Sequence, residues 1–434
     1  WTVADGWRVG MLVDEAHNLI ERARKMYSAS LDQDVFNAGR RDAPASIKPS
    51  LDGIARVWNS ATRMQDEPYR VYDSLPDGLL GALDKAVAAI LDYLGVSPTG
   101  LKPELQTFFF AALRFCRLAA DFDAGTLFEI DKVAEAGTRA SGPSKMTEAA
   151  GARSVLCLRN IVPRRYLAPR FAAAHATVLF SATLAPHAFF RDVLGLPKEA
   201  QWIDVRSPFH PDQLAVRLVP SISTRFRDRE RSLAPIAKLV ARQYDAQPGN
   251  YLAFFSSFDY LNRVAAMLEA RHPAIPVWKQ SRDMTEPART TFLERFALDG
   301  RGIGFAVLGG AFAEGIDLPG SRLIGAFIAT LGLPQINAVN EEMQRRMHAM
   351  FGTGFEYTYL YPGIQKVVQA AGRVIRARSD RGVLYLIDDR FTHAEVHELL
   401  PAWWRIAGQL PVASASGDQP SGSKVQRSGS APAR

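Results

Sequence analysis

The sequence predicts an α/β protein with a mostly parallel sheet. After Pro208, short apolar runs alternate with helical patterns: the runs at 251–256 and 304–308 enclose a helical stretch at 260–270. This alternation is typical of parallel strands covered by helices. Apolar residues make up 47% and charged residues 22% of the 434 residues, the balance of an ordinary globular chain. At about 150 residues per domain, this length predicts roughly three domains.

The N-terminal part begins with a short apolar run at residues 9–13, which we expect to form a buried strand. Residues 20–125 then follow a helical pattern, with Leu83, Val87 and Ile90 among the apolar residues at helical spacing. Residues 137–151 are rich in Gly, Ser, Ala and Thr and predict a loop.

Further strands and helices are expected along the rest of the chain at 154–158, 177–180, 214–219, 235–244, 251–256, 260–270, 304–308, 322–328, 365–375 and 382–387. Residues 411–434 consist largely of Ser, Gly, Ala and Pro, which predicts a disordered tail.

Composition narrows the classes of function. The formal net charge of +7 favours a polyanionic partner. Cys116 and Cys157 are the only cysteines, which excludes a disulfide scaffold and a four-cysteine metal or iron–sulfur site. A reducing, cytoplasmic location fits best. The uncharged stretches 171–190 and 323–340 are broken by polar residues and proline, so no membrane span is expected.

Two carboxylates, Asp14 and Glu15, directly follow the first predicted strand. Open α/β sheets bind ligands at the carboxyl ends of their strands. In nucleotide hydrolases one acid at this place holds Mg²⁺, and its neighbour polarises the attacking water. The alternative is a solvated helix start, because acids are favourable in a first turn.

A second candidate site lies in residues 369–376. On a helix, Gln369, Arg373 and Arg376 occupy positions i, i+4 and i+7 and are expected to share one face, with Gly372 leaving room for close approach. Two guanidiniums on one face can clamp the oxygens of a transferring phosphoryl group. The alternative is a basic, solvated helix face.

Three weaker patterns each follow a predicted strand. The first strand ends in the small and hydroxyl residues Ser181, Ala182 and Thr183, and the second ends in Ser256 and Ser257. The third is followed by a glycine pair and then by Glu314, Gly315 and Asp317. Hydroxyls and glycine backbone are suited to phosphate contacts. Each pattern is weak alone. Together with the acid pair and the 369–376 segment they make five motifs, and the occurrence of all five in one order is far less expected by chance.

In this order the motifs resemble those of superfamily 2 helicases, specifically the XPD/DinG-like group. Residues 14–17 resemble motif II, the DEAH box, and residues 369–376 resemble motif VI. Residues 181–183, 255–257 and 314–317 resemble motifs III, IV and V. The helical stretch after the DEAH box is similar to the arch domain of this group. The resemblance covers nearly all of residues 1–408.

The resemblance implies two RecA-like P-loop NTPase lobes with ATP between them, an inserted arch-like domain, and ATP-driven movement along single-stranded DNA, usually 5′ to 3′. By resemblance, Asp14 coordinates Mg²⁺, Glu15 activates water and His17 couples the nucleotide state to the second lobe. Arg373 and Arg376 contact the γ-phosphate. The remaining implied roles are nucleotide binding by Gln369, Gly372, Glu314, Gly315 and Asp317, and coupling by Ser181, Ala182 and Thr183.

The same resemblance divides the chain into five parts. The first lobe comprises its end portion at 1–20 and its remainder at 151–198, with the arch-like insertion at 21–150 between them. The second lobe follows at 199–410 and the tail at 411–434. On the DNA path we expect Ser256 and Ser257 together with Arg225 and Arg227, which lie just before motif IV.

The chain has no Gly-Lys dipeptide and hence no Walker A loop. In the XPD/DinG-like group that loop lies upstream of the DEAH box, as do the cysteines of any iron–sulfur cluster. We therefore expect a chain that starts after both and does not hydrolyse ATP alone. Two alternatives stay open: a non-catalytic nucleic-acid-binding subunit with a degenerate helicase fold, and an RNA helicase.

Overall fold

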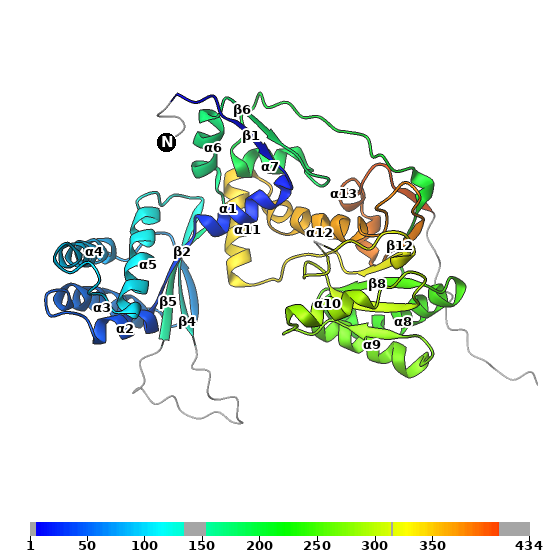
Figure 1. Cartoon of the computed structure of the whole chain (residues 1–434), viewed down its shortest axis with the longest axis horizontal. Coiled ribbons are helices and arrows are strands. Elements are labelled where there is room, and N and C mark those ends of the chain that lie inside the picture. Colours follow the sequence, from blue (N-terminus) through cyan, green and yellow to red (C-terminus); the bar gives the residue numbers. More distant parts are fainter. Residues whose placement is uncertain (1–5, 134–152, 314–315, 408–434) are drawn as a thin grey trace, which may run out of the picture. The chain divides into compact units, whose positions relative to one another are not determined.

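The computed structural model describes residues 6–133, 153–313 and 316–407 (Figure 1). The predicted loop at 137–151, the predicted tail at 411–434, and Glu314 and Gly315 lie outside these ranges. The chain divides into two compact units. Unit 1 comprises Trp1–Pro208, Leu331–Gly372 and Glu395–Pro401, and unit 2 comprises Phe209–Thr330, Arg373–Ala394 and Ala402–Arg434.

Unit 2 is built on a seven-stranded sheet in which every pair of neighbours is parallel. The strand order is β13-β7-β12-β11-β8-β10-β9. The strand bounds are β7 Leu214–Leu218, β8 Asn250–Phe255, β9 Val277–Lys279, β10 Gly302–Val307, β11 Gly325–Ala329, β12 Gly382–Leu386 and β13 Arg405–Ala407. The predicted alternation of strands and helices is confirmed here.

The core of unit 2 forms because its central strands are apolar at nearly every position, with Asn250 at the start of β8 as the polar exception. All residues of β8 and β11 are buried, as expected for strands covered on both faces. Helices α8 (Arg229–Ala246) and α9 (Phe258–Arg271) lie side by side and pack on the sheet (Figure 1). Phe255 of β8 stacks on Phe305 of β10 with ring centroids 5.4 Å apart. Unit 2 also contains α10 (Glu286–Glu294), and α13 (Ala394–His397) begins at the last residue of a unit 2 segment and continues in a unit 1 segment.

Unit 1 contains a small parallel pair of strands, β1 (Gly10–Val13) and β6 (Ala176–Leu179). Five helices and a π-helical turn surround or adjoin this pair: α1 Leu19–Met26, α6 Arg164–Ala173, α7 His187–Leu194, α11 Ala338–Phe351, the turn Glu356–Leu360 and α12 Tyr361–Ala371. Their shared core includes Phe190, Val193 and Met347, each fully buried.

The first strand is present but is not buried, contrary to the prediction. Leu12 is 77% exposed, and its neighbour across the pair, Val178, is 51% exposed. Among the described residues β1 pairs only with β6, so the sheet has just two strands. The face that carries Leu12 and Val178 is not covered by other described residues.

The long segment between β1 and β6 contains a second sheet, which is antiparallel and has the order β2-β5-β4-β3. Its strands are β2 Ala29–Asp32, β5 Arg153–Asn160, β4 Thr126–Val133 and β3 Tyr69–Tyr72, and its helices are α2 Gln33–Arg41, α3 Lys48–Arg63, α4 Leu79–Val96 and α5 Pro103–Ala119. The helices share one core with this sheet, centred on Trp58 and Phe108. The segment is therefore mixed α+β, whereas the sequence pattern predicted helices alone over 20–125.

Two further observations on the described residues concern helix length and the cysteines. None of the helices there has both the length and the apolar character needed to span a bilayer. Cys116 and Cys157 are free thiols, and burial raises the pKa of each to about 12. Both thiols are therefore protonated and unreactive near neutral pH.

Candidate functional site

Asp14 and Glu15 follow β1 directly, where the strand ends. Asp14 is exposed, and its Oδ1 accepts a hydrogen bond of 2.7 Å from the backbone N–H of Glu15. Glu15 has φ 49° and ψ 43°, a left-handed conformation that is uncommon for a residue other than Gly, Asn or Asp. Such backbone conformations cost free energy and cluster at functional sites. Both carboxylates are therefore held at the strand end and open to solvent.

His17 lies behind these acids, with 8% of the residue exposed. Its Nδ1 lies 2.7 Å from Ser181 Oγ and 3.3 Å from Glu15 Oε2. The contact arises because β1 and β6 are parallel neighbours whose carboxyl ends meet at one edge. Two segments that the sequence separates by more than 160 residues thus form one cluster.

Helix α12 adds two glutamines to this cluster. Gln369 Nε2 donates to His17 Nε2, and Gln365 Nε2 donates to the backbone O of Thr183 at 3.3 Å. The two glutamines are four residues apart and so share one helix face. Because His17 Nε2 accepts, the proton of the neutral imidazole is on Nδ1, from which it donates to Ser181 Oγ.

The predicted common helix face of Gln369, Arg373 and Arg376 is wrong. Helix α12 ends at Ala371, so both arginines lie beyond it. Further along, Asp380 Oδ2 accepts hydrogen bonds from the backbone N–H groups of Arg376 and Ala377, at 2.8 and 2.7 Å. These amides therefore bond to a side chain and not to helical carbonyls. Gly372, the C-cap residue of α12, occupies an ordinary helical conformation.

In unit 2, Arg373 and Arg376 hold one neighbouring segment. Arg373 donates from Nε to the backbone O of Ala313 at 3.2 Å and from Nη1 to that of Ile316 at 3.0 Å. Arg376 Nε donates to Asp317 Oδ1 at 3.0 Å, and the two side chains are 38% and 68% exposed. The Arg376–Asp317 pair is therefore accessible to a ligand from solvent.

The hydroxyls after β8 have structural partners. Ser257 caps α9 by accepting the backbone N–H of Tyr260 at 3.2 Å. Ser256 Oγ accepts from Arg229 Nη2 at 2.8 Å. Both residues lie at the carboxyl end of a central strand, on the sheet edge where parallel sheets bind ligands.

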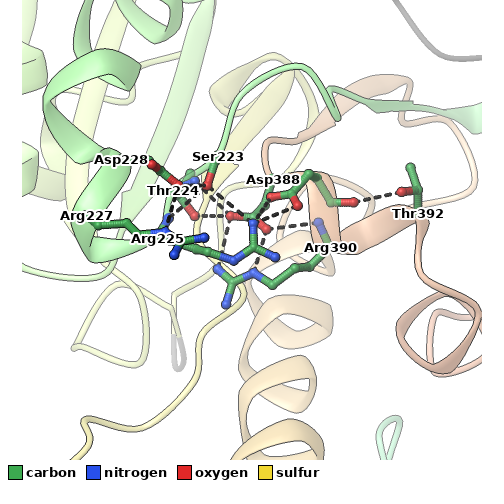
Figure 2. A network of polar contacts seen from close by, with 9 residues as sticks. Ser223, Thr224, Arg225, Arg227, Asp228, Asp388, Arg390 and Thr392 are labelled. Atoms are coloured by element: carbon green, nitrogen blue, oxygen red, sulfur yellow. Dashed lines mark hydrogen bonds and ion pairs between the residues drawn. The ribbon is translucent and has the colours of Figure 1, made fainter.

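A buried polar network lies at the same edge, after β7 and β12 (Figure 2). Asp388 is fully buried, and its Oδ2 accepts from both the backbone N–H and the hydroxyl of Thr224. Arg390 Nε and Nη2 donate to the same carboxylate at 2.7 and 3.0 Å. Burial alone would raise the pKa of Asp388, but the hydrogen bonds and charge of Arg390, with those of Thr224, hold it below its ordinary value.

The structure separates Arg225 from Arg227. Arg225 Nη1 donates to both carboxylate oxygens of Asp389 at 2.5 and 2.6 Å, and this bonding raises the pKa of Arg225. Arg227 has an 81% exposed side chain and a long 3.8 Å ion pair with Asp228. Arg225 is thus an anchor of its loop, whereas Arg227 extends into solvent.

Sequence reasoning missed Asp388, although a signal for it was present. The apolar strand β12 is followed by Asp388 and Asp389, the same arrangement of a strand ending in two acids that marks Asp14 and Glu15. Thr224 carried no comparable signal, because its role depends on a contact across the sheet edge.

Comparisons with known proteins find similarity to helicases. A family model described as the helicase C-terminal domain matches residues 240–407. An ATP-dependent helicase DinG of Mycobacterium tuberculosis H37Ra is 28% identical over 61% of this chain and 40% of its own length. An ATP-dependent DNA helicase chl1 of Aspergillus clavatus is 26% identical over 58% of this chain and 40% of its own length. The chain thus spans well under half the length of these relatives.

Solved structures share the fold. A structure titled XPD_Helicase has a TM-score of 0.52 at 19% identity, covering 89% of this chain and 66% of that one. The structure of S. tokodaii Xpd4 has a TM-score of 0.55 at 15% identity, covering 92% of this chain and 75% of that one. The parallel sheets of the two units match the RecA-like lobes of XPD-like helicases.

Proposed function

We propose that the chain works in an ATP-dependent DNA helicase, because its sequence is similar to DinG and chl1 helicases and its fold is shared with XPD structures. The enzyme couples ATP hydrolysis to 5′-to-3′ movement on single-stranded DNA and to duplex unwinding. The observation that carries the proposal is the cluster of His17 with Glu15, Ser181 and Gln369. It joins a strand-end acid pair to a helix that leads directly to Arg373.

The donors at the end of β1 fit a magnesium–nucleotide complex. Mg²⁺ is bound by one or two carboxylates together with phosphates and water, and Asp14 offers an exposed carboxylate. The hydroxyl of Thr183 is buried without a hydrogen-bond partner among the described residues, which leaves a polar atom available beside this cluster. When bound, the ion neutralises charge on the phosphates.

Glu15 is the proposed general base. Its side chain is 62% exposed, so a water molecule can reach it, and Ser181 Oγ lies 3.5 Å from its Oε2. The left-handed backbone at Glu15 fixes the direction in which the carboxylate leaves the strand end. Glu15 thus orients a water and accepts its proton.

His17 is the proposed coupling residue. A hydrogen-bonded path runs from Glu15 through Ser181 and His17 to Gln369. Gln369 lies in the last turn of α12, and the chain continues from there to Arg373. A change in the contacts of Glu15 during hydrolysis therefore alters the hydrogen bond that holds the end of α12.

Arg376 is the proposed phosphate-binding arginine of unit 2. Its present partner, Asp317, is a solvent-exposed carboxylate, and an ion pair of this kind stabilises by about 0–1 kcal/mol. A γ-phosphate carries more charge than a carboxylate and can displace it. Arg373 has two backbone carbonyl partners and instead bonds to Ala313 and Ile316.

The test of the proposal is ATP hydrolysis by the complete gene product in the presence of single-stranded DNA, duplex DNA or single-stranded RNA. We expect single-stranded DNA to stimulate hydrolysis most. Stimulation by RNA alone would identify an RNA helicase, and a lack of hydrolysis with each of the three polymers would identify a non-catalytic subunit. The 434-residue chain alone, which has no Gly-Lys dipeptide, is expected to be inactive.

A further inference from the structure

We propose that Phe226 stacks on an unpaired nucleobase of a bound single strand, and that Arg227 binds the adjacent phosphate. The inference rests on the proposed function and names the side chains by which unit 2 holds the strand. Both residues lie in a short 3₁₀ turn, Phe226–Asp228, between β7 and α8. The turn lies on the carboxyl side of β7, next to the buried network of Asp388.

The two side chains are unusually open. Phe226 is 83% exposed, and the side chain of Arg227 is 81% exposed. A single exposed apolar residue needs no explanation by itself. This one is different because arginines flank it on both sides at alternate positions, at 225, 227, 229 and 231. An aromatic ring among guanidiniums is the combination that binds single strands, in which rings stack on bases and cations neutralise phosphates.

The turn is rigid at both ends (Figure 2). Before it, Thr224 is bonded to the fully buried Asp388, and Arg225 is bonded to Asp389. At its last residue, Asp228 Oδ2 accepts from Ser223 Oγ at 2.7 Å. Most of the ordering of this turn is thus present before any ligand arrives, which lowers the entropy lost on binding.

Arg229 supports the ring from one side. Its guanidinium carbon lies 5.1 Å from the centroid of Phe226 and 5.3 Å from that of Tyr260, and its Nη2 donates to Ser256. Since Phe226 stays 83% exposed despite this contact, most of its ring surface is available to a base. Because Arg229 bonds to Ser256, its guanidinium lies near the end of β8, where phosphate contacts were predicted.

Stacking on Phe226 requires a base whose face is open. In a duplex each base face is covered by its neighbours, whereas in a single strand the faces can be separated and placed against a ring. Arg227 alone would bind the phosphates of either form. The ring therefore provides the preference for single strands, with little dependence on base identity.

The experiment is a fluorescence-anisotropy titration of the 434-residue chain with two single strands of equal length, one with bases and one abasic. Phe226→Ala should weaken binding of the base-containing strand by about tenfold and leave the abasic strand unchanged. Phe226→Trp should retain the wild-type difference between the two strands. Arg227→Ala should weaken both strands equally and reduce the log–log salt slope by about 0.7.

Leu298→Ala is the matched control. Leu298 is 69% exposed and precedes β10, so it lies at the opposite, amino-terminal edge of the same sheet, and its loss should change nothing. If the wild type binds single strands but Phe226→Ala behaves like Leu298→Ala, or weakens both strands equally, the stacking role is wrong and the proposed function survives. If the wild type binds no single strand, both fail.

Discussion

Gln369 donates a hydrogen bond to His17 from a position 352 residues further along the chain. His17 in turn contacts Ser181, so three separate segments meet at one imidazole. The contact joins the acid pair after β1 to the last turn of α12, which continues into Arg373. In our account this imidazole is where the state of the nucleotide is passed to the rest of the chain.

Removal of the proposed base should stop turnover but not binding. In the complete gene product, Glu15→Gln should lower the ATP hydrolysis rate by at least about 100-fold, because the amide keeps the shape but cannot accept a proton. Nucleotide affinity, measured with a fluorescent ATP analogue, should change little. Glu21→Gln, on the exposed face of α1, is the control. Near-normal hydrolysis by Glu15→Gln would remove Glu15 from the mechanism.

Loss of the Gln369 side chain should uncouple hydrolysis from DNA. Gln369→Ala removes the donor to His17, so basal ATP hydrolysis should persist while its stimulation by single-stranded DNA falls severalfold. Hydrolysis rates with and without DNA measure the ratio directly. Gln201→Ala removes an exposed amide that donates to the backbone of Glu199, two residues away, and should leave the ratio unchanged. An unchanged ratio in Gln369→Ala would contradict the coupling role.

Arg376 and its partner Asp317 should behave differently when each is changed. Arg376→Ala should reduce turnover by about 10³-fold or more if its guanidinium binds the transferring phosphoryl group. Asp317→Asn breaks the same exposed ion pair but keeps the guanidinium, so turnover should be largely retained. Thermal unfolding should change little for both variants, since exposed pairs contribute about 0–1 kcal/mol. Equal losses of turnover would mean that the pair acts only structurally.

Asp388 should dominate the stability of the loops after β7 and β12. Asp388→Ala leaves Arg390 and Thr224 without their shared acceptor, and breaking a buried pair of this kind costs about 3–5 kcal/mol. Asp389→Ala removes an ion pair at a partly exposed side chain and should cost about 0–1 kcal/mol. Urea unfolding of the two variants measures this difference, and equal midpoints would contradict it.

The pH dependence of Asp388 follows from the sign of its shift. Its pKa in the folded chain lies below the ordinary value of 3.8, so the folded state favours the ionised carboxylate. The stabilisation is complete above that ordinary value and is lost as the pH falls through the lower, folded-state pKa. The unfolding free energy of the wild type should therefore fall more steeply in acid than that of Asp388→Ala. Parallel curves below pH 4 would show that Asp388 is not held ionised.

The sequence predicted the sheet of unit 2 well because its strands are continuous apolar runs between clear helical patterns. It did not predict β2 and β3, since strands of four residues are too short to show a period against the surrounding helices. The helix end at Ala371 was also missed. Past this end, the Asp380 side chain bonds the backbone amides of Arg376 and Ala377, and the helical pattern of the sequence does not indicate that contact.

From the sequence we could propose which residues belong to the candidate site, but not which of them contact one another. The order of the motifs led us to propose Asp14, His17 and Gln369, but nothing local to any of them indicates that His17 and Gln369 share a hydrogen bond. Asp388 was missed although its strand ends in two acids, because that pattern was read only at β1. The exposure of Phe226 was beyond sequence reasoning, since an aromatic residue beside a strand is more often part of the core.

The most direct test of the account is strand displacement by the complete gene product on duplexes with a single-stranded tail at either the 5′ or the 3′ end. We expect ATP-dependent release of the labelled strand from the 5′-tailed duplex, and none by Glu15→Gln. Release from the 3′-tailed duplex alone would contradict the proposed direction. ATP hydrolysis without displacement of either duplex, or displacement that Glu15→Gln performs equally well, would contradict the proposal that this chain drives an ATP-dependent DNA helicase.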